Sequence, residues 1–108
     1  MQPVYDAADL EELKNSSRGL LVYFSNEACS VCKVLKPKVE GLLQSSFPGM
    51  GSRYVDIEKS MAIAGQHRVF TIPTLILYFD GKEHMRFSRN FSLRELEETI
   101  QKPYSLLF

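Results

Sequence analysis

Two cysteines, Cys29 and Cys32, are the residues of this sequence whose type and spacing are best suited to chemistry. Thiol–disulfide exchange needs a thiolate that attacks a disulfide and a second thiol that releases the resulting mixed disulfide. A pair separated by two residues supplies both thiols when it lies on the first turn of a helix. A bridge across so short a loop constrains the unfolded chain little, so stabilising the fold is a poor reason for it. We therefore predict a redox-active pair with Cys29 as the catalytic nucleophile and Cys32 as the resolving thiol.

The start of a helix is also a place where the Cys29 thiolate is favoured. A free thiol with a pKa of about 8.5 is only about 3 % ionised at pH 7, whereas a pKa near 7 leaves it about half ionised. That change corresponds to roughly 2 kcal/mol. A helix N-terminus supplies about 0.3–2 kcal/mol, and a hydrogen bond from the Cys32 thiol can add the remainder. The nucleophile therefore needs no dedicated base to form.

Three other interpretations of the cysteine pair stay open. Half of a zinc site has the same Cys-x-x-Cys spacing, but the sequence contains no second such pair, and we expect His67 and His84 to be isolated surface side chains. A metal cluster shared between two chains is also compatible with the spacing. The third interpretation is a pair of small core residues without activity. Our prediction is a site with no metal and no cofactor.

The elements around the pair alternate between strands and helices. Leu20–Phe24 is a continuously apolar run, which is typical of a strand buried on both faces. A polar loop then leads to the cysteines. From Val31 onward, apolar residues recur every three or four positions, which predicts an amphipathic helix. Pro37 is expected to kink this helix, and Pro48-Gly49 to end it.

The remaining elements complete an α/β arrangement. We expect further strands and helices at Ala7–Asn15 (helix), Arg53–Ile57 (strand), Ser60 to about His67 (helix), Val69-Phe70 (brief extended segment), Thr74–Phe79 and Lys82–Ser88 (strands), and a last helix that starts at the capping box Ser92–Glu95 and ends at Pro103. Strand–helix–strand units imply right-handed parallel crossovers, and the Asp80-Gly81 hairpin adds an antiparallel edge. The sequence predicts one sheet with helices on both faces.

These motifs together resemble the thioredoxin family over nearly the whole chain. The residues that carry the resemblance are Leu20–Phe24, Cys29-Ser30-Val31-Cys32-Lys33, Pro37, Thr71-Ile72-Pro73-Thr74-Leu75 and Asp80-Gly81. The resemblance implies a thioredoxin fold, with a central mixed β-sheet flanked by helices and an N-terminal strand that is short or absent. It also implies a single thioredoxin-like domain over residues 1–108.

The resemblance further implies a cis peptide bond between Ile72 and Pro73 that lies against the cysteine pair. Cis bonds are uncommon even before proline. In the family, the bond frees the backbone of the preceding residue, here Ile72, to pair with an extended substrate peptide. Ile72 and Pro73 are thus the expected substrate-binding residues. The alternative for Pro73 is an ordinary proline at the entry of a strand.

The sequence departs from the family pattern around the site. Ser30-Val31 stands where typical reductants have Gly-Pro, and Ala28 replaces the usual Trp. Tyr23 takes the place of the buried aspartate that accepts a proton from the resolving thiol, and a phenol with a pKa of about 10 cannot replace a carboxylate base. Arg89 falls near a glycine that usually lines the substrate groove. These changes leave the nucleophile in place, but they raise the alternative of a binding or regulatory module with little general reductase activity.

Composition restricts the partners that the protein is expected to have. Thirteen basic and thirteen acidic residues cancel, and the 44 % hydrophobic and 24 % charged content is ordinary for a globular domain. We see no basic stripe for nucleic acid, no apolar stretch long enough for a membrane and no signal peptide. We expect a cytoplasmic protein disulfide oxidoreductase that acts on protein thiols and disulfides, with a reductase as the candidate electron donor.

Overall fold

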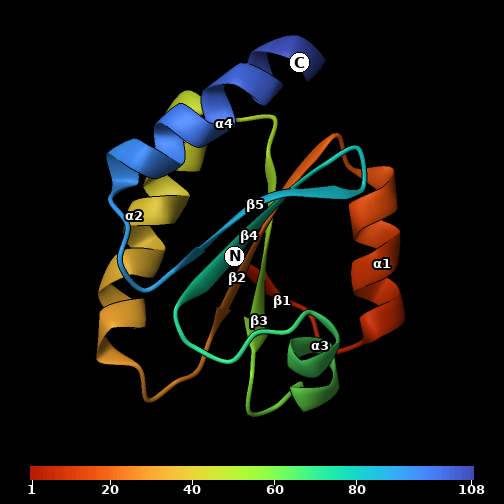
Figure 1. Ribbon diagram of the computed structural model, residues 1–108, viewed down its shortest axis with the longest axis vertical. Coiled ribbons are helices and arrows are strands. Elements are labelled where there is room, and N and C mark those ends of the chain that lie inside the picture. The colour runs from red at the N-terminus through yellow and green to blue at the C-terminus, as the bar shows by residue number, and fades with distance from the viewer.

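A computed structural model describes residues 1–108 as one five-stranded mixed sheet with helices on both faces. The strand order is β1-β3-β2-β4-β5. Helices α2 and α4 cover one face, and α1 and α3 cover the other (Figure 1). The elements are β1 (Gln2–Pro3), α1 (Ala7–Ser16), β2 (Gly19–Ser25), α2 (Ser30–Ser46), β3 (Gly51–Asp56), α3 (Met61–Gln66), β4 (Thr74–Phe79), β5 (Lys82–Ser88) and α4 (Leu93–Leu107). No helix among them is long and apolar enough to cross a membrane.

Strand β2 is the centre of the sheet, and all seven of its residues are buried, including the five of the predicted run Leu20–Phe24. It pairs in parallel with β3 and antiparallel with β4. Because side chains alternate along a strand, Leu21 and Tyr23 point into the core under α2 and α4, while Leu20, Val22 and Phe24 point into the core under α1 and α3. This alternation places Tyr23 beneath the helix that carries the cysteines.

The direction of β4 corrects one expectation from the sequence. The β2–α2–β3 unit is a parallel crossover, as predicted, but β4 runs antiparallel to β2. Helix α3 has only six residues, so no long helix carries the chain back along the sheet before β4 begins. The chain therefore enters β4 at the end of the sheet where β3 leaves it. As a result Pro73, at the entry of β4, lies at the same end of the sheet as the start of α2.

The two ends of the chain differ in how well they were predicted. The N-terminal strand is short, as expected: β1 has two residues, and the Val4 N–H extends its pairing to the Tyr54 carbonyl at 2.9 Å. Helix α4, in contrast, does not end at Pro103 but continues to Leu107. The last turn is held from outside, because the Tyr104 hydroxyl accepts the Gly49 N–H at 3.0 Å and the Tyr104 ring packs on Phe47. These contacts outweigh the backbone hydrogen bond that Pro103 cannot donate.

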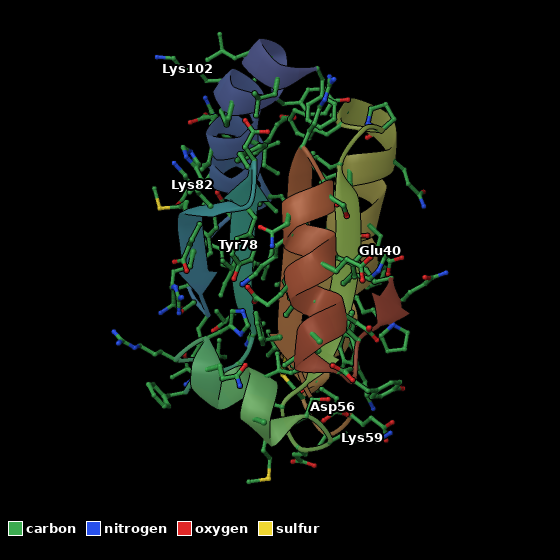
Figure 2. All side chains as sticks on the ribbon, turned by 90° about the vertical axis from the view of Figure 1, so that its right-hand side faces the viewer. Glu40, Asp56, Lys59, Tyr78, Lys82 and Lys102 are labelled. Atoms are coloured by element: carbon green, nitrogen blue, oxygen red, sulfur yellow. A yellow bond between two sulfur atoms is a disulfide. The ribbon has the colours of Figure 1, made fainter.

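His67 is also placed differently from the expectation, whereas His84 is exposed as predicted. The His67 side chain is only 8 % exposed, and its Nε2 lies 3.0 Å from Lys14 Nζ of α1. Lys14 is itself buried with its Nζ 4.7 Å from the centre of the Tyr78 ring. Figure 2 views this face, with α1 in front of the sheet and Tyr78 labelled on β4. The His67 side chain is buried because it contacts Lys14 of α1, which lies 53 residues earlier in the sequence. Val69-Phe70, after His67, forms no strand.

Candidate active site

Cys29 is the N-cap of α2, and Cys32 lies one turn inside the helix, as the spacing predicted. The Cys29 Sγ accepts a hydrogen bond from the Cys32 N–H at 3.2 Å, so one free N–H of the helix start points at this sulfur. The two residues form a disulfide with their Cα atoms 5.3 Å apart. Cys29 is partly exposed, whereas Cys32 is 2 % exposed. The arrangement favours an anion at Cys29 and leaves only this sulfur open to a large molecule.

The loop before Cys29 is tied to the loop that follows β3. Lys59 Nζ forms an ion pair with Glu27 at 3.1 Å, and Asn26 Nδ2 donates to Glu58 Oε1 at 3.1 Å. The Cys29 N–H bonds weakly to the Asn26 carbonyl at 3.5 Å. β2 ends at Ser25, directly before this loop. The end of the central strand and these contacts therefore position the start of α2 (Figure 1).

Cys29 shares an open hollow of about 470 Å³ with the segment before β4. The peptide bond between Ile72 and Pro73 is cis. Ile72 is half-buried and lines the hollow, while the following residue, Pro73, is buried and does not line it. The structure thus brings two of the predicted site residues, Cys29 and Ile72, to one hollow, with Pro73 next to Ile72 in the chain. The full lining is Asn26, Ala28, Cys29, Phe70, Thr71, Ile72 and Arg89.

Arg89 reaches the same hollow from the end of β5. Its backbone has a φ of +55°, and its N–H donates to the Pro73 carbonyl at 3.0 Å. Arg89 therefore lines the same hollow as Cys29, and its place at a substrate groove stays a prediction. Phe70, on the same hollow, is 83 % exposed. Sequence reasoning missed Phe70 as a site residue, although its position two residues before Ile72 was a signal for it.

Tyr23 lies fully buried beneath the cysteine pair. Its hydroxyl donates a hydrogen bond to the Cys32 carbonyl oxygen at 2.9 Å. Burial raises the pKa of Tyr23 to about 12, and the neighbouring Tyr54 adds to the shift. The phenol is therefore neutral at neutral pH, and its O–H group is hydrogen-bonded to the backbone of α2. Tyr23 holds α2 against β2 but supplies no base for a thiol.

A second hollow of about 250 Å³ lies beside Cys32 and contains residues that sequence reasoning missed. Tyr54 stacks on Tyr23 with ring centres 6.3 Å apart, and Lys36 Nζ lies 4.4 Å from the centre of the Tyr54 ring. Burial raises the pKa of Tyr54. Lys33 also lines this hollow. Tyr54 becomes a site residue only through its pairing with Tyr23 across β2 and β3, which the sequence alone does not reveal.

The ionisable residues do not form a metal centre within this chain. No group of three or more His, Cys, Asp or Glu side chains is arranged to hold a metal ion. His67 contacts Lys14 under the opposite face of the sheet, and His84 packs its ring against Phe79. Neither histidine lines the two hollows beside the cysteines.

Comparison with known proteins identifies one family, and it is the family that the sequence motifs resemble. The family model described as Thioredoxin matches residues 3–102. A thioredoxin of Chlamydia trachomatis is 38 % identical over 82 residues, which cover 76 % of each chain. The thioredoxin-like protein YdfQ of Bacillus subtilis is 26 % identical over 98 % of this chain and 94 % of its own length. The X-ray structure of Fasciola hepatica thioredoxin is 34 % identical with a TM-score of 0.79, covering 91 % of this chain and 97 % of its own.

Proposed function

Because the chain belongs to the thioredoxin family and is a thiol–disulfide oxidoreductase with a disulfide-forming Cys29–Cys32 pair, we propose that Cys29 is its nucleophile and Cys32 its resolving thiol. The observation that carries these roles is the difference in exposure. Cys29 opens on a hollow of about 470 Å³, whereas Cys32 is 2 % exposed and cannot meet a protein disulfide first. The helix start, with the Cys32 N–H aimed at the Cys29 Sγ, supports the thiolate at Cys29.

The reaction moves two electrons and two protons from the reduced protein to a client disulfide. The Cys29 thiolate attacks one client sulfur, a mixed disulfide forms, and the other client sulfur leaves as a thiolate that takes a proton from water. The Cys32 thiol then loses its proton and attacks the Cys29 Sγ. The second client thiolate leaves, and the Cys29–Cys32 disulfide forms. An external dithiol or a reductase must return the two electrons before the next cycle.

Ile72 and Pro73 are proposed to hold the client beside Cys29. Strand addition uses main-chain hydrogen bonds from an extended segment, so it suits a protein that meets different sequences. The support for this role is the common hollow, in which Ile72 lies beside Cys29 at the entry of β4. Pro73 is buried and ends the loop before β4. No cofactor takes part in this reaction.

Tyr23 favours slow resolution of the mixed disulfide in comparison with family members that have a buried acid. The Cys32 proton must reach water or a client group, because Tyr23 is a neutral phenol whose pKa burial raises to about 12 and cannot serve as the base. The hollow of about 250 Å³ beside Cys32 offers water a route to this sulfur. General reductase turnover is therefore expected to be modest, and a regulatory role on one class of client is the second candidate function.

Reduction of insulin by dithiothreitol is the direct test of the proposed roles. Wild-type protein should accelerate insulin precipitation, and Cys29→Ser should abolish the acceleration. Cys32→Ser should accumulate a mixed disulfide with insulin, because its nucleophile remains and its resolving thiol is lost. The absence of wild-type turnover, or equal turnover in Cys29→Ser, would contradict the proposal. Redox-independent binding of the same client by a Cys29→Ser, Cys32→Ser double variant would instead favour the regulatory role.

We further infer one thioredoxin-like domain over residues 1–108 and a reducing compartment, the cytoplasm, as its location. The sheet includes residues from both halves of the chain, and α4 packs on the same core as α2, which supports one cooperative unit. A single unfolding transition seen by both tyrosine fluorescence and circular dichroism is the expected result. Fractionation of cells that make the native protein, followed by trapping of the Cys29–Cys32 redox state, tests the location.

A further inference from the structure

We propose that Arg89 selects clients that carry a carboxylate within two or three residues of the target disulfide. The inference rests on the proposed function, because Arg89 lines the hollow in which Cys29 meets its client. It adds the chemical class of the preferred client, an extended acidic peptide segment, to the reaction described above. Three observations carry it: the backbone conformation of Arg89, its missing partner and the charge around the cysteines.

Arg89 occupies a backbone conformation that is unfavourable for its residue type. A φ of +55° lies in the left-handed region, which glycine adopts freely and residues with a β-carbon avoid. The hydrogen bond from the Arg89 N–H to the Pro73 carbonyl at 3.0 Å holds this conformation next to the client hollow. The Arg89 side chain therefore lies at the rim of the hollow, although glycine would fit this backbone conformation better.

The guanidinium of Arg89 has no acidic partner within the chain. Two neighbours in the sequence show the contrast: Arg86 is paired with Glu83 at 2.8 Å, and Arg94 is paired with Glu98 at 3.0 Å. Arg89 takes part in none of the ion pairs of the protein. The hollow that it lines contains no Asp or Glu. Its planar donors are therefore available for a carboxylate that comes from outside.

Among the ionisable side chains that line the two hollows beside the cysteine pair, basic ones outnumber acidic ones, although the carboxylate of Glu58 bonds to Asn26 at their edge. Lys33 and Lys36 line the hollow on the Cys32 side. The one acidic residue of that hollow, Glu27, is paired with Lys59 at 3.1 Å. Unpaired positive charge therefore lies on both sides of the pair. Such a field attracts acidic segments and disfavours basic ones.

The reach of Arg89 defines where the client carboxylate must lie. A client strand beside Ile72 advances about 3.3 Å per residue, so two residues cover about 7 Å along it. A residue one to three positions from the attacked cysteine passes over the hollow that Arg89 and Cys29 share. Phe70, at the rim of this hollow and 83 % exposed, can cover the apolar part of the same segment.

The test uses symmetric disulfide-linked dimers of one short peptide, identical except for Glu or Gln at the positions that flank the cysteine. The rate constant for reduction of each peptide by the reduced protein is measured for wild type and Arg89→Gln. Because both proteins meet the same peptides, any intrinsic effect of Glu on the reactivity of the disulfide cancels. The expected result is a Glu-to-Gln rate ratio about threefold higher for wild type than for Arg89→Gln, with the difference reduced at 1 M salt.

Arg68→Gln is the matched control. Arg68 is also an exposed arginine with a left-handed φ, of +56°, but it lines a different hollow together with Arg86. Its replacement removes the same charge and should leave the wild-type ratio unchanged. Equal ratios for wild type and Arg89→Gln would overturn the proposal. So would an equal loss in Arg68→Gln, which would assign the effect to net charge alone.

A second arm separates this proposal from the proposed function. If wild type reduces neither peptide, the proposed function fails, and the peptides are then S-methylated and titrated into the oxidised protein. NMR shifts of residues 70–73 and 89 report binding, and wild type should bind the Glu peptide about threefold more tightly than the Gln peptide. Equal affinities would overturn the role of Arg89. Arg89→Asn serves where Arg89→Gln does not fold, because Asn tolerates the left-handed region.

Discussion

The Tyr23 hydroxyl donates a hydrogen bond to the Cys32 carbonyl oxygen at 2.9 Å, which joins the central strand to the first turn of the helix that carries the cysteines. Both residues are buried, so this bond forms in the interior directly beneath the disulfide. Burial raises the pKa of Tyr23 to about 12, so Tyr23 is a neutral phenol at ordinary pH and is no base for the proton of the Cys32 thiol. Tyr23 therefore has a structural role beneath the pair, and the proposed resolving step at Cys32 must pass its proton to another group.

Tyr23→Phe should lower the stability of the protein without slowing the reaction of Cys32. Loss of one buried hydrogen bond is expected to lower the free energy of unfolding by about 0.5–1.5 kcal/mol. The rate at which Cys32 resolves a mixed disulfide should stay within about twofold of wild type, because the phenol moves no proton in this step. Urea unfolding and rapid-quench kinetics measure the two quantities. A tenfold slower resolution with an unchanged fold would show that Tyr23 acts on the thiol.

Stability should fall at alkaline pH through the ionisation of Tyr23. Burial raises its pKa to about 12 in the folded protein, against about 10 in the unfolded chain. The neutral phenol is therefore favoured by folding, and its contribution is complete below pH 10 and lost as the pH rises toward 12. Over this interval the group lowers the stability by up to about 1.4 kcal/mol per pH unit.

Urea unfolding of the oxidised protein between pH 8 and 11.5 measures this loss. The matched variant is Tyr23→Phe, in which the decline above pH 10 should be shallower because one ionisable phenol is gone. Tyr54 and Tyr78, whose pKa values are also raised by burial, remain in both proteins and contribute to the residual slope. Identical pH profiles for wild type and Tyr23→Phe would contradict the assignment.

The features that the sequence predicted correctly are those with local signals. The apolar period after Val31 and the spacing of Cys29 and Cys32 together place the pair at the start of α2, because helical periodicity is a property of neighbouring residues. The burial of Leu20–Phe24 in β2 follows from an uninterrupted apolar run in the same way. The Asp80-Gly81 hairpin between β4 and β5 needed no knowledge of the remaining fold.

The features that were missed depend on contacts between distant segments. His67 is buried because Lys14, 53 residues earlier, lies against it. Tyr54 enters the site because it pairs in register with Tyr23 across two strands. Helix α4 continues past Pro103 because Tyr104 is held by Gly49 and Phe47. In each case tertiary contacts decide the result, and no local pattern reports them.

Arg89→Gly should stabilise the protein while it removes a charge from the client hollow. Glycine relieves the left-handed backbone at φ +55°, and this relief of about 1–2 kcal/mol is partly offset by the larger entropy that glycine loses on folding. We expect a net gain of about 0.5–1 kcal/mol in the free energy of unfolding. Arg68→Gly, at φ +56°, should give a gain of similar size. A loss of stability in Arg89→Gly alone would indicate that the side chain packs in a way that supports the fold.

Two glycine-to-alanine substitutions near the redox helix should have opposite signs. Gly41 lies inside α2, and a β-carbon there would meet nothing within 4 Å. Alanine is favoured over glycine in a helix, so Gly41→Ala should raise the free energy of unfolding by about 0.5–1 kcal/mol. At Gly49 a β-carbon would lie 2.7 Å from a Phe108 ring carbon and 3.1 Å from the Tyr104 hydroxyl. Gly49→Ala should therefore displace both rings and destabilise the end of α4 by about 1–3 kcal/mol.

Thermal unfolding of the two oxidised variants beside wild type measures both effects. Because Gly41 is distant from the cysteines along α2, the rate of insulin reduction should remain unchanged in Gly41→Ala, which shows that stability and turnover are separable in this helix. Destabilisation by Gly41→Ala would mean that this part of α2 is not a regular helix in solution. A neutral effect of Gly49→Ala would mean that Phe108 and Tyr104 do not pack on Gly49 and that α4 ends earlier than Leu107.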